Sequence, residues 1–90
     1  MRYKVTTRTE TIRQNTRLDD TKYGGWLCVN TGTAPVTVLG IELQPAEGLD
    51  FTSALQPGDL WAQPIDITIQ PGGELRLVRM IYQPISEDKK

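Results

Sequence analysis

Residues 26–43 read WLCVNTGTAPVTVLGIEL, a pattern that predicts two β-strands joined by a short polar turn. The first strand, 26–29, is apolar on both faces, and the second, 36–43, is rich in the β-branched residues that favour strands. Between them, Asn30 and Gly32 tolerate positive φ, while Pro35 has a fixed φ and no amide hydrogen to donate. We therefore expect these two strands to pair as a hairpin, with a β-domain built around them.

Outside this stretch, further segments alternate between apolar and polar residues. Short strands are predicted at 49–52 and 65–69, and a long strand at 74–82, with turns at 44–48, 56–59 and 70–73. Residues 2–13 predict a polar edge strand, or an arm that becomes ordered by pairing, and 14–25 predict a loop. No segment has a helical period over ten or more residues. The chain is thus predicted to be all-β, a small antiparallel sandwich of about six to seven strands.

Ninety residues suffice for one domain with a thin core. We divide it into a basic N-terminal arm and loop (1–22), a sandwich body (23–84) and a flexible tail (85–90). No run of 18 apolar residues and no secretory signal is visible, so the sequence predicts no membrane contact and synthesis in the cytoplasm. The single cysteine, Cys28, fits a reducing compartment and is interpreted as a small buried hydrophobe.

The composition argues against catalysis. The chain has no histidine, which removes the commonest general base and the commonest metal ligand. Its carboxylates are scattered singly, apart from Asp19 and Asp20, which are interpreted as a solvated turn. We therefore predict a protein that is not an enzyme and has no cofactor and no metal site.

Charge is distributed unevenly along the chain. Residues 1–22 contain six cations and three anions, whereas residues 23–75 contain six carboxylates and no lysine or arginine. A basic arm beside an acidic body can form ion pairs within one molecule or between neighbours. Nucleic-acid binding is not predicted, because Tyr3 is the only aromatic residue among the cations of the arm and the body is acidic. The candidate interaction residues of the arm are Arg2, Lys4, Arg8, Arg13 and Arg17.

The last strand is apolar on both faces. One parity holds Leu75, Leu77, Arg79 and Ile81, and the other holds Val78, Met80 and Tyr82 together with Arg76. A sheet with one solvated face should alternate cleanly, so either a β-bulge switches the faces midway or another chain covers one face. Trp61, in a short segment between two prolines, is interpreted either as a cap on the core or as an interface residue. The second set of candidate interaction residues is Trp61, Leu75, Leu77, Arg79 and Ile81.

Several of these motifs together resemble the immunoglobulin-like sandwich of the ASH/MSP type. They are an N-x-G turn after a strand (Asn30 to Gly32), an inward aromatic residue (Phe51), a P-G turn (Pro71-Gly72), and an aromatic-x-Pro ending (Tyr82 to Pro84). The resemblance implies a sandwich used for protein binding or scaffolding, without enzymatic activity or ligand residues. That family usually has one more strand after the aromatic-x-Pro ending. Here it is missing, donated by a neighbour, or replaced by the N-terminal arm.

These observations predict a non-enzymatic structural or interaction module within a larger assembly, with protein partners that are other copies of itself or different chains. By analogy, such a chain is similar to the small virion accessory proteins with which tailed phages decorate capsids and tails. The alternative is a carbohydrate- or cell-surface-binding sandwich that uses the aromatic side chains Tyr23, Trp26 and Trp61.

Overall fold

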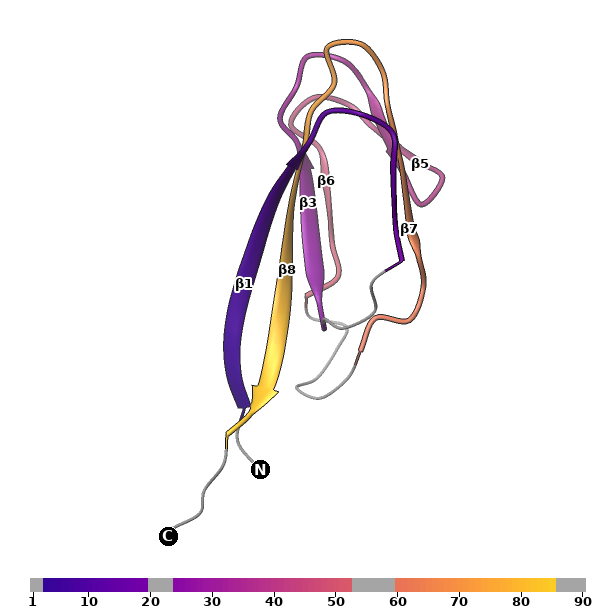
Figure 1. Cartoon of the computed structure of the whole chain (residues 1–90). Helices are drawn as coiled ribbons and strands as arrows, with labels where there is room; N and C mark the ends of the chain where they lie inside the picture. Colours follow the sequence, from indigo (N-terminus) through magenta and orange to yellow (C-terminus); the bar gives the residue numbers. More distant parts are fainter. Residues whose placement is uncertain (1–2, 20–23, 53–59, 86–90) are drawn as a thin grey trace, which may run out of the picture.

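The computed structural model describes residues 3–19, 24–52 and 60–85, which form eight β-strands and no helix. Two antiparallel four-stranded sheets pack face to face, with strand orders β1-β8-β3-β6 (sheet A) and β2-β7-β4-β5 (sheet B) (Figure 1). This confirms the all-β sandwich and corrects the predicted count of six to seven strands. The strands are β1 (Tyr3–Ile12), β2 (Thr16–Leu18), β3 (Trp26–Asn30), β4 (Val36–Val38), β5 (Ile41–Leu43), β6 (Gly48–Asp50), β7 (Ile65–Ile69) and β8 (Leu75–Pro84).

Two segments account for the additional strands. The predicted strand at 36–43 divides into β4 and β5, because Leu39 and Gly40 both have positive φ (53° and 79°) and form a tight hairpin turn. The segment predicted as a loop at 14–25 contains β2, in which Thr16 to Leu18 pair with Ile67 to Ile65 of β7. Three residues are too few for a recognisable alternation, so only the pairing reveals this strand.

The predicted turn at 30–35 joins two sheets rather than two paired strands. The buried Asn30 holds this crossing in place: its Nδ2 donates to the carbonyls of Ala34 (2.9 Å) and Leu43 (3.0 Å), and its Oδ1 accepts from the amide of Gly32 (2.9 Å). Because β3 belongs to sheet A and β4 to sheet B, the prediction that these two segments pair with each other is wrong.

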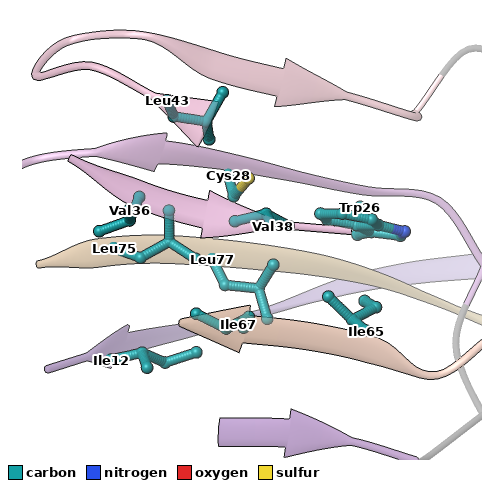
Figure 2. Packing of buried hydrophobic residues seen from close by; sticks show 10 residues of the cluster. All are labelled: Ile12, Trp26, Cys28, Val36, Val38, Leu43, Ile65, Ile67, Leu75 and Leu77. Atoms are coloured by element: carbon teal, nitrogen blue, oxygen red, sulfur yellow. The ribbon is translucent and has the colours of Figure 1, made fainter. Parts of the chain in front are cut away.

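The core lies between the two sheets (Figure 2). Strict alternation places the inward side chains, with Trp26, Val38, Ile65, Leu75 and Leu77 each 0% exposed. At one end, Trp26 packs against Phe51 and Trp61, with ring centroids 4.9 and 5.3 Å away. The ten buried hydrophobic residues are Ile12, Trp26, Cys28, Val36, Val38, Leu43, Ile65, Ile67, Leu75 and Leu77.

The two longest strands form a ribbon that projects from the sandwich. β1 and β8 pair without interruption, from Tyr3 opposite Pro84 to Ile12 opposite Leu75. β3 begins only at Trp26, opposite Arg79, so the end of the ribbon has two strands and the molecule measures 55 × 20 × 19 Å (Figure 1). The N-terminal arm is therefore ordered by pairing with the last strand of its own chain.

This register also resolves an alternative from the sequence. Every residue of β8 between Leu75 and Pro84 has one partner in β1, so the described strand contains no bulge and its faces do not switch. Of the two alternatives, the bulge is therefore excluded. Some predictions lie outside the described residues, namely those for Arg2, Asp20, Tyr23, the turn at 56–59 and residues 86–90 of the tail.

Candidate interaction surface

The outward face of sheet B is polar across all four strands. Alternation and register place on it Arg17 of β2, Asp66 and Thr68 of β7, Thr37 of β4 and Glu42 of β5. Its inward neighbours, such as Ile67 and Val38, are buried. This sheet has the clean alternation expected where one face meets water.

The outward face of sheet A is different. We define the outer apolar face as the six hydrophobic residues that point away from the core on three adjacent strands. Val29 and Val5 are 36% and 47% exposed, and the other four are half-buried. Contiguous exposed apolar residues of this kind mark protein contact sites. The six residues are Val5 (β1), Leu27 and Val29 (β3), and Val78, Met80 and Tyr82 (β8).

This result changes which residues of β8 can meet a partner. Leu75 and Leu77 are fully buried between the sheets and Arg79 is 4% exposed, so these predicted interaction residues belong to the core side. Ile81, on the same side, is half-buried. The two-sided apolar pattern of the last strand does correspond to apolar side chains on both faces of sheet A. The pattern alone did not indicate which parity faces outward, and the outer apolar face was missed for that reason.

Arg79 is held by an ion pair inside sheet A. Its Nη2 donates to Oε1 of Glu10, which lies on the neighbouring strand β1 and faces the same side of the sheet. The Arg79 side chain is 5% exposed and that of Glu10 is 29% exposed. A buried guanidinium requires such a partner, so this pair has a structural role.

The four described cations of the N-terminal arm fall into two groups, one paired with the body and one exposed on β1. Arg13 and Arg17 pair with carboxylates of the body: Nε of Arg13 lies 2.9 Å from Glu74, and Nη1 of Arg17 lies 3.0 Å from Asp66. Hydrogen bonding to Asp19 and the charge of Asp66 raise the pKa of Arg17 above its ordinary value. Lys4 and Arg8 are exposed on β1, on the side of the ribbon opposite to Val5.

Two opposite charges border the outer apolar face. Arg76 lies on it beside Val29, and Asp50 lies on it beside Leu27. The hydroxyl and the amide of Thr52 donate to Oδ1 of Asp50 (2.6 and 2.9 Å) and hold the pKa of this carboxyl below its ordinary value. The surface thus combines an apolar centre with charged margins, which is the usual anatomy of a protein interface.

The aromatic residues considered for carbohydrate binding are placed less favourably. Trp26 is completely buried, and Trp61 is half-buried against Trp26 and Phe51, with the two indoles edge to face. Of the two interpretations of Trp61, the structure supports the cap on the core. An open hollow of about 400 Å³ between β1 and β2 is lined by seven residues, none of them aromatic: Glu10, Thr11, Ile12, Arg13, Gln14, Thr16 and Leu18.

Reactive groups do not gather in the described ranges. No three or more histidine, cysteine, aspartate or glutamate residues lie close enough there to hold a metal ion. Cys28 is 1% exposed, and burial raises the pKa of its thiol. None of the described residues belongs to a helix that could cross a membrane.

Comparison with protein-family models, with curated proteins and with solved structures finds no match for this chain. The resemblance to the immunoglobulin-like ASH/MSP-type sandwich therefore remains a prediction from the motifs. The outer apolar face, identified from geometry alone, is the strongest candidate for a functional surface.

Proposed function

We propose that this chain is a non-enzymatic interaction module that binds a protein partner through the outer apolar face of sheet A. One observation carries the proposal: the two outward faces of the same sandwich differ in chemistry. On the outward face of sheet B, the five positions named above are all polar, whereas the outward face of sheet A carries a connected set of hydrophobic side chains. The uninterrupted register excludes a bulge, one of the two explanations that the sequence left open, and so supports the other, a partner that covers this face.

The geometry suits a partner with a broad, flat contact surface. Val78 lies at the centre of the face, between Leu27 of β3 and Thr9 of β1. A few residues near the centre of an interface, where water is excluded, give most of the binding free energy, while charged residues at the rim orient the partner. Arg76 and Asp50 are placed to do this.

The proposal is tested by a matched pair of substitutions, Val78→Glu and Thr68→Glu. Each adds one carboxylate to the outward face of an inner strand, β8 of sheet A for Val78 and β7 of sheet B for Thr68. Neither side chain belongs to the core. We expect a tagged chain recovered from its native source to bring the same partner with it as the wild type when it carries Thr68→Glu, and to lose it with Val78→Glu. Equal recovery with both variants, each shown to be folded by circular dichroism, would contradict the proposal.

The assembly that we favour is a virion, in which the chain would decorate or reinforce a capsid or a tail. The support for this is an analogy of size and architecture, together with the projecting ribbon. Quantitative mass spectrometry of purified particles is the decisive measurement. A fixed number of copies per particle is expected, and absence of the chain from particles would direct the search to a cellular assembly.

A further inference from the structure

The outer edge of β1 presents an unpaired row of backbone groups. Met80 exchanges hydrogen bonds with Gly24 and Gly25 on the β3 side of β8, so the backbone groups of Arg79 and Ile81 point toward β1. Their partners Arg8 and Thr6 therefore use their own backbone groups toward β8. By alternation, the N–H and C=O groups of the odd-numbered residues, among them Val5, Thr7 and Thr9, point away from the sheet. Within the described residues, no strand pairs with this edge.

Edge strands are usually made poor templates for further pairing. They are short, or carry a proline, a bulge or charges that repel another strand. β1 is ten residues long, with an unbroken register, no proline and four threonines, which favour strands. Its only charges are Lys4, Arg8 and Glu10, and all three share one face. These charges do not block pairing in general. They select among the registers in which a second β1 can pair.

Two antiparallel copies of β1 can exchange backbone hydrogen bonds only where odd-numbered residues face odd-numbered residues. Any two-fold axis that passes through a residue, odd or even, meets this condition. With Thr6 on the axis, Lys4 would face Arg8 of the other copy, and with Arg8 on the axis, two arginines would face each other. With Thr7 on the axis, Lys4 faces Glu10 of the other copy, twice, and Arg8 faces Thr6. Cross-strand pairs of opposite charge stabilise a sheet and like charges destabilise it.

The remaining candidate has Thr9 on the axis, which pairs Arg8 with Glu10 of the other copy. Its overlap covers only residues 6–12, whereas the register centred on Thr7 covers residues 3–11 and therefore makes more backbone hydrogen bonds. In both registers the opposite charges face each other at pairs that are not hydrogen-bonded through the backbone, where facing side chains are closest, so the longer overlap decides in favour of Thr7. Glu10 is already oriented by Arg79, which bonds one of its oxygens.

We propose that a second copy of this chain pairs with the free edge of β1, antiparallel and centred on Thr7, to join two copies of sheet A into one continuous eight-stranded sheet. The two-fold axis is perpendicular to the sheet, so both outer apolar faces lie on the same side of it. This inference rests on the proposed function, since it names one partner of the interaction module. It uses the edge of the sheet, however, and not the outer apolar face.

The register is tested by disulfide formation in two single variants, Thr7→Cys and Thr9→Cys. In the proposed dimer the two Cα atoms of residue 7 are about 5.5 Å apart, within the range that a disulfide spans, whereas those of residue 9 are about 13 Å apart. Under mild oxidation we expect a covalent dimer from Thr7→Cys and none from Thr9→Cys. The wild type controls for the buried Cys28. A dimer from Thr9→Cys, or none from either variant, would overturn the proposal.

A second pair of variants tests the charges. Lys4→Glu and Arg8→Glu make the same change in charge on the same face of β1, and both positions are exposed. We expect sedimentation equilibrium to show that Lys4→Glu weakens dimerisation roughly tenfold or more, while Arg8→Glu has a much smaller effect, because only Lys4 faces a charge across the two-fold axis. Equal weakening by both variants, or a wild type that stays monomeric at high concentration, would refute the inference.

The two proposals fail separately. Val78→Glu lies on the outer apolar face, away from the β1 edge, and should leave the dimer intact while it abolishes binding of the other partner. If the wild type is a monomer that still binds its partner through the outer apolar face, the dimer is refuted and the proposed function is not.

Discussion

At the scale of single residues, the ion pair between Arg79 and Glu10 should contribute measurably to stability. Glu10→Gln would replace the carboxylate that pairs with a buried guanidinium by a neutral amide, and we expect it to lower the free energy of unfolding by about 2–3 kcal/mol. Urea denaturation measures this loss. The control is Glu42→Gln on the polar face of sheet B, for which we expect a change within about 0.5 kcal/mol. Similar losses in both variants would show that Arg79 does not depend on Glu10.

Cys28 provides a second residue-scale prediction. Its thiol is buried and its pKa is raised above the ordinary value of 9.0, so little thiolate is present at neutral pH and reagents cannot reach it. We expect iodoacetamide to label Cys28 only when the chain unfolds. Leu27→Cys in a Cys28→Ala background is the comparison, because residue 27 points outward on the same strand and should react in the folded protein. Comparable labelling rates at the two positions would contradict the assigned faces of β3.

At the scale of elements, two glycines are required for different reasons: Gly40 for its backbone conformation and Gly32 for the close approach of another segment. Gly40 has φ of +79° and open space around it. Gly40→Ala should therefore lower the free energy of unfolding by only about 1 kcal/mol, the cost of holding alanine in the left-handed conformation. A Cβ at Gly32 would lie 2.4 Å from the amide nitrogen of Glu74, so Gly32→Ala must displace the loop from the turn at 70–73, at about 2–3 kcal/mol. Thermal or urea unfolding gives both values. A larger loss for Gly40→Ala would reverse this assignment.

The contact between the loop at 30–35 and Glu74, the residue before β8, should be visible in a pH titration of Glu74. The hydroxyl of Thr31 donates to Oε1 of Glu74 (2.7 Å), and this hydrogen bond is the main cause of a pKa below the ordinary value of 4.5. A lowered pKa in the folded state means that the contribution to stability is complete above pH 4.5 and is lost as the pH falls through the folded value. We expect Thr31→Val to raise the pKa of Glu74 in an NMR titration. An unchanged midpoint would leave the guanidinium groups of Arg13 and Arg76 as the cause.

For the whole molecule, two of the described cations of the arm are paired with carboxylates of the body. Arg13 and Arg17 reach from the arm to Glu74 and Asp66 of the body, and these pairs are solvent-exposed. Exposed pairs contribute little and are screened by salt. We therefore expect the free energy of unfolding to change by less than about 1 kcal/mol between low salt and 0.5 M sodium chloride. A larger loss in high salt would mean that the arm is held mainly by charge rather than by the β1–β8 ladder.

Local patterns were sufficient for much of this architecture. Strict alternation predicted the inward side chains of β7, and the β-branched run predicted Val36 and Val38 as neighbours on one face, both of which are buried. Asn30, Gly32 and Pro35 correctly marked a break between strands. The three-residue β2 and the buried position of Arg79 could not be predicted in this way, since each depends on a partner far along the chain.

By itself, the sequence determined that the chain is all-β, where most strands lie, and that the last strand is apolar on both sides, because these properties depend on neighbouring residues alone. Only the tertiary structure decided which side of that strand faces the core, which strands share a sheet, and that the basic arm pairs with the last strand of its own chain. The physical reason is that backbone pairing is non-local: Tyr3 meets Pro84, and Trp26 meets Arg79. When a strand is apolar on both faces, its sequence is equally compatible with either face turned toward the core. Only the strands that pair with it decide which face is buried.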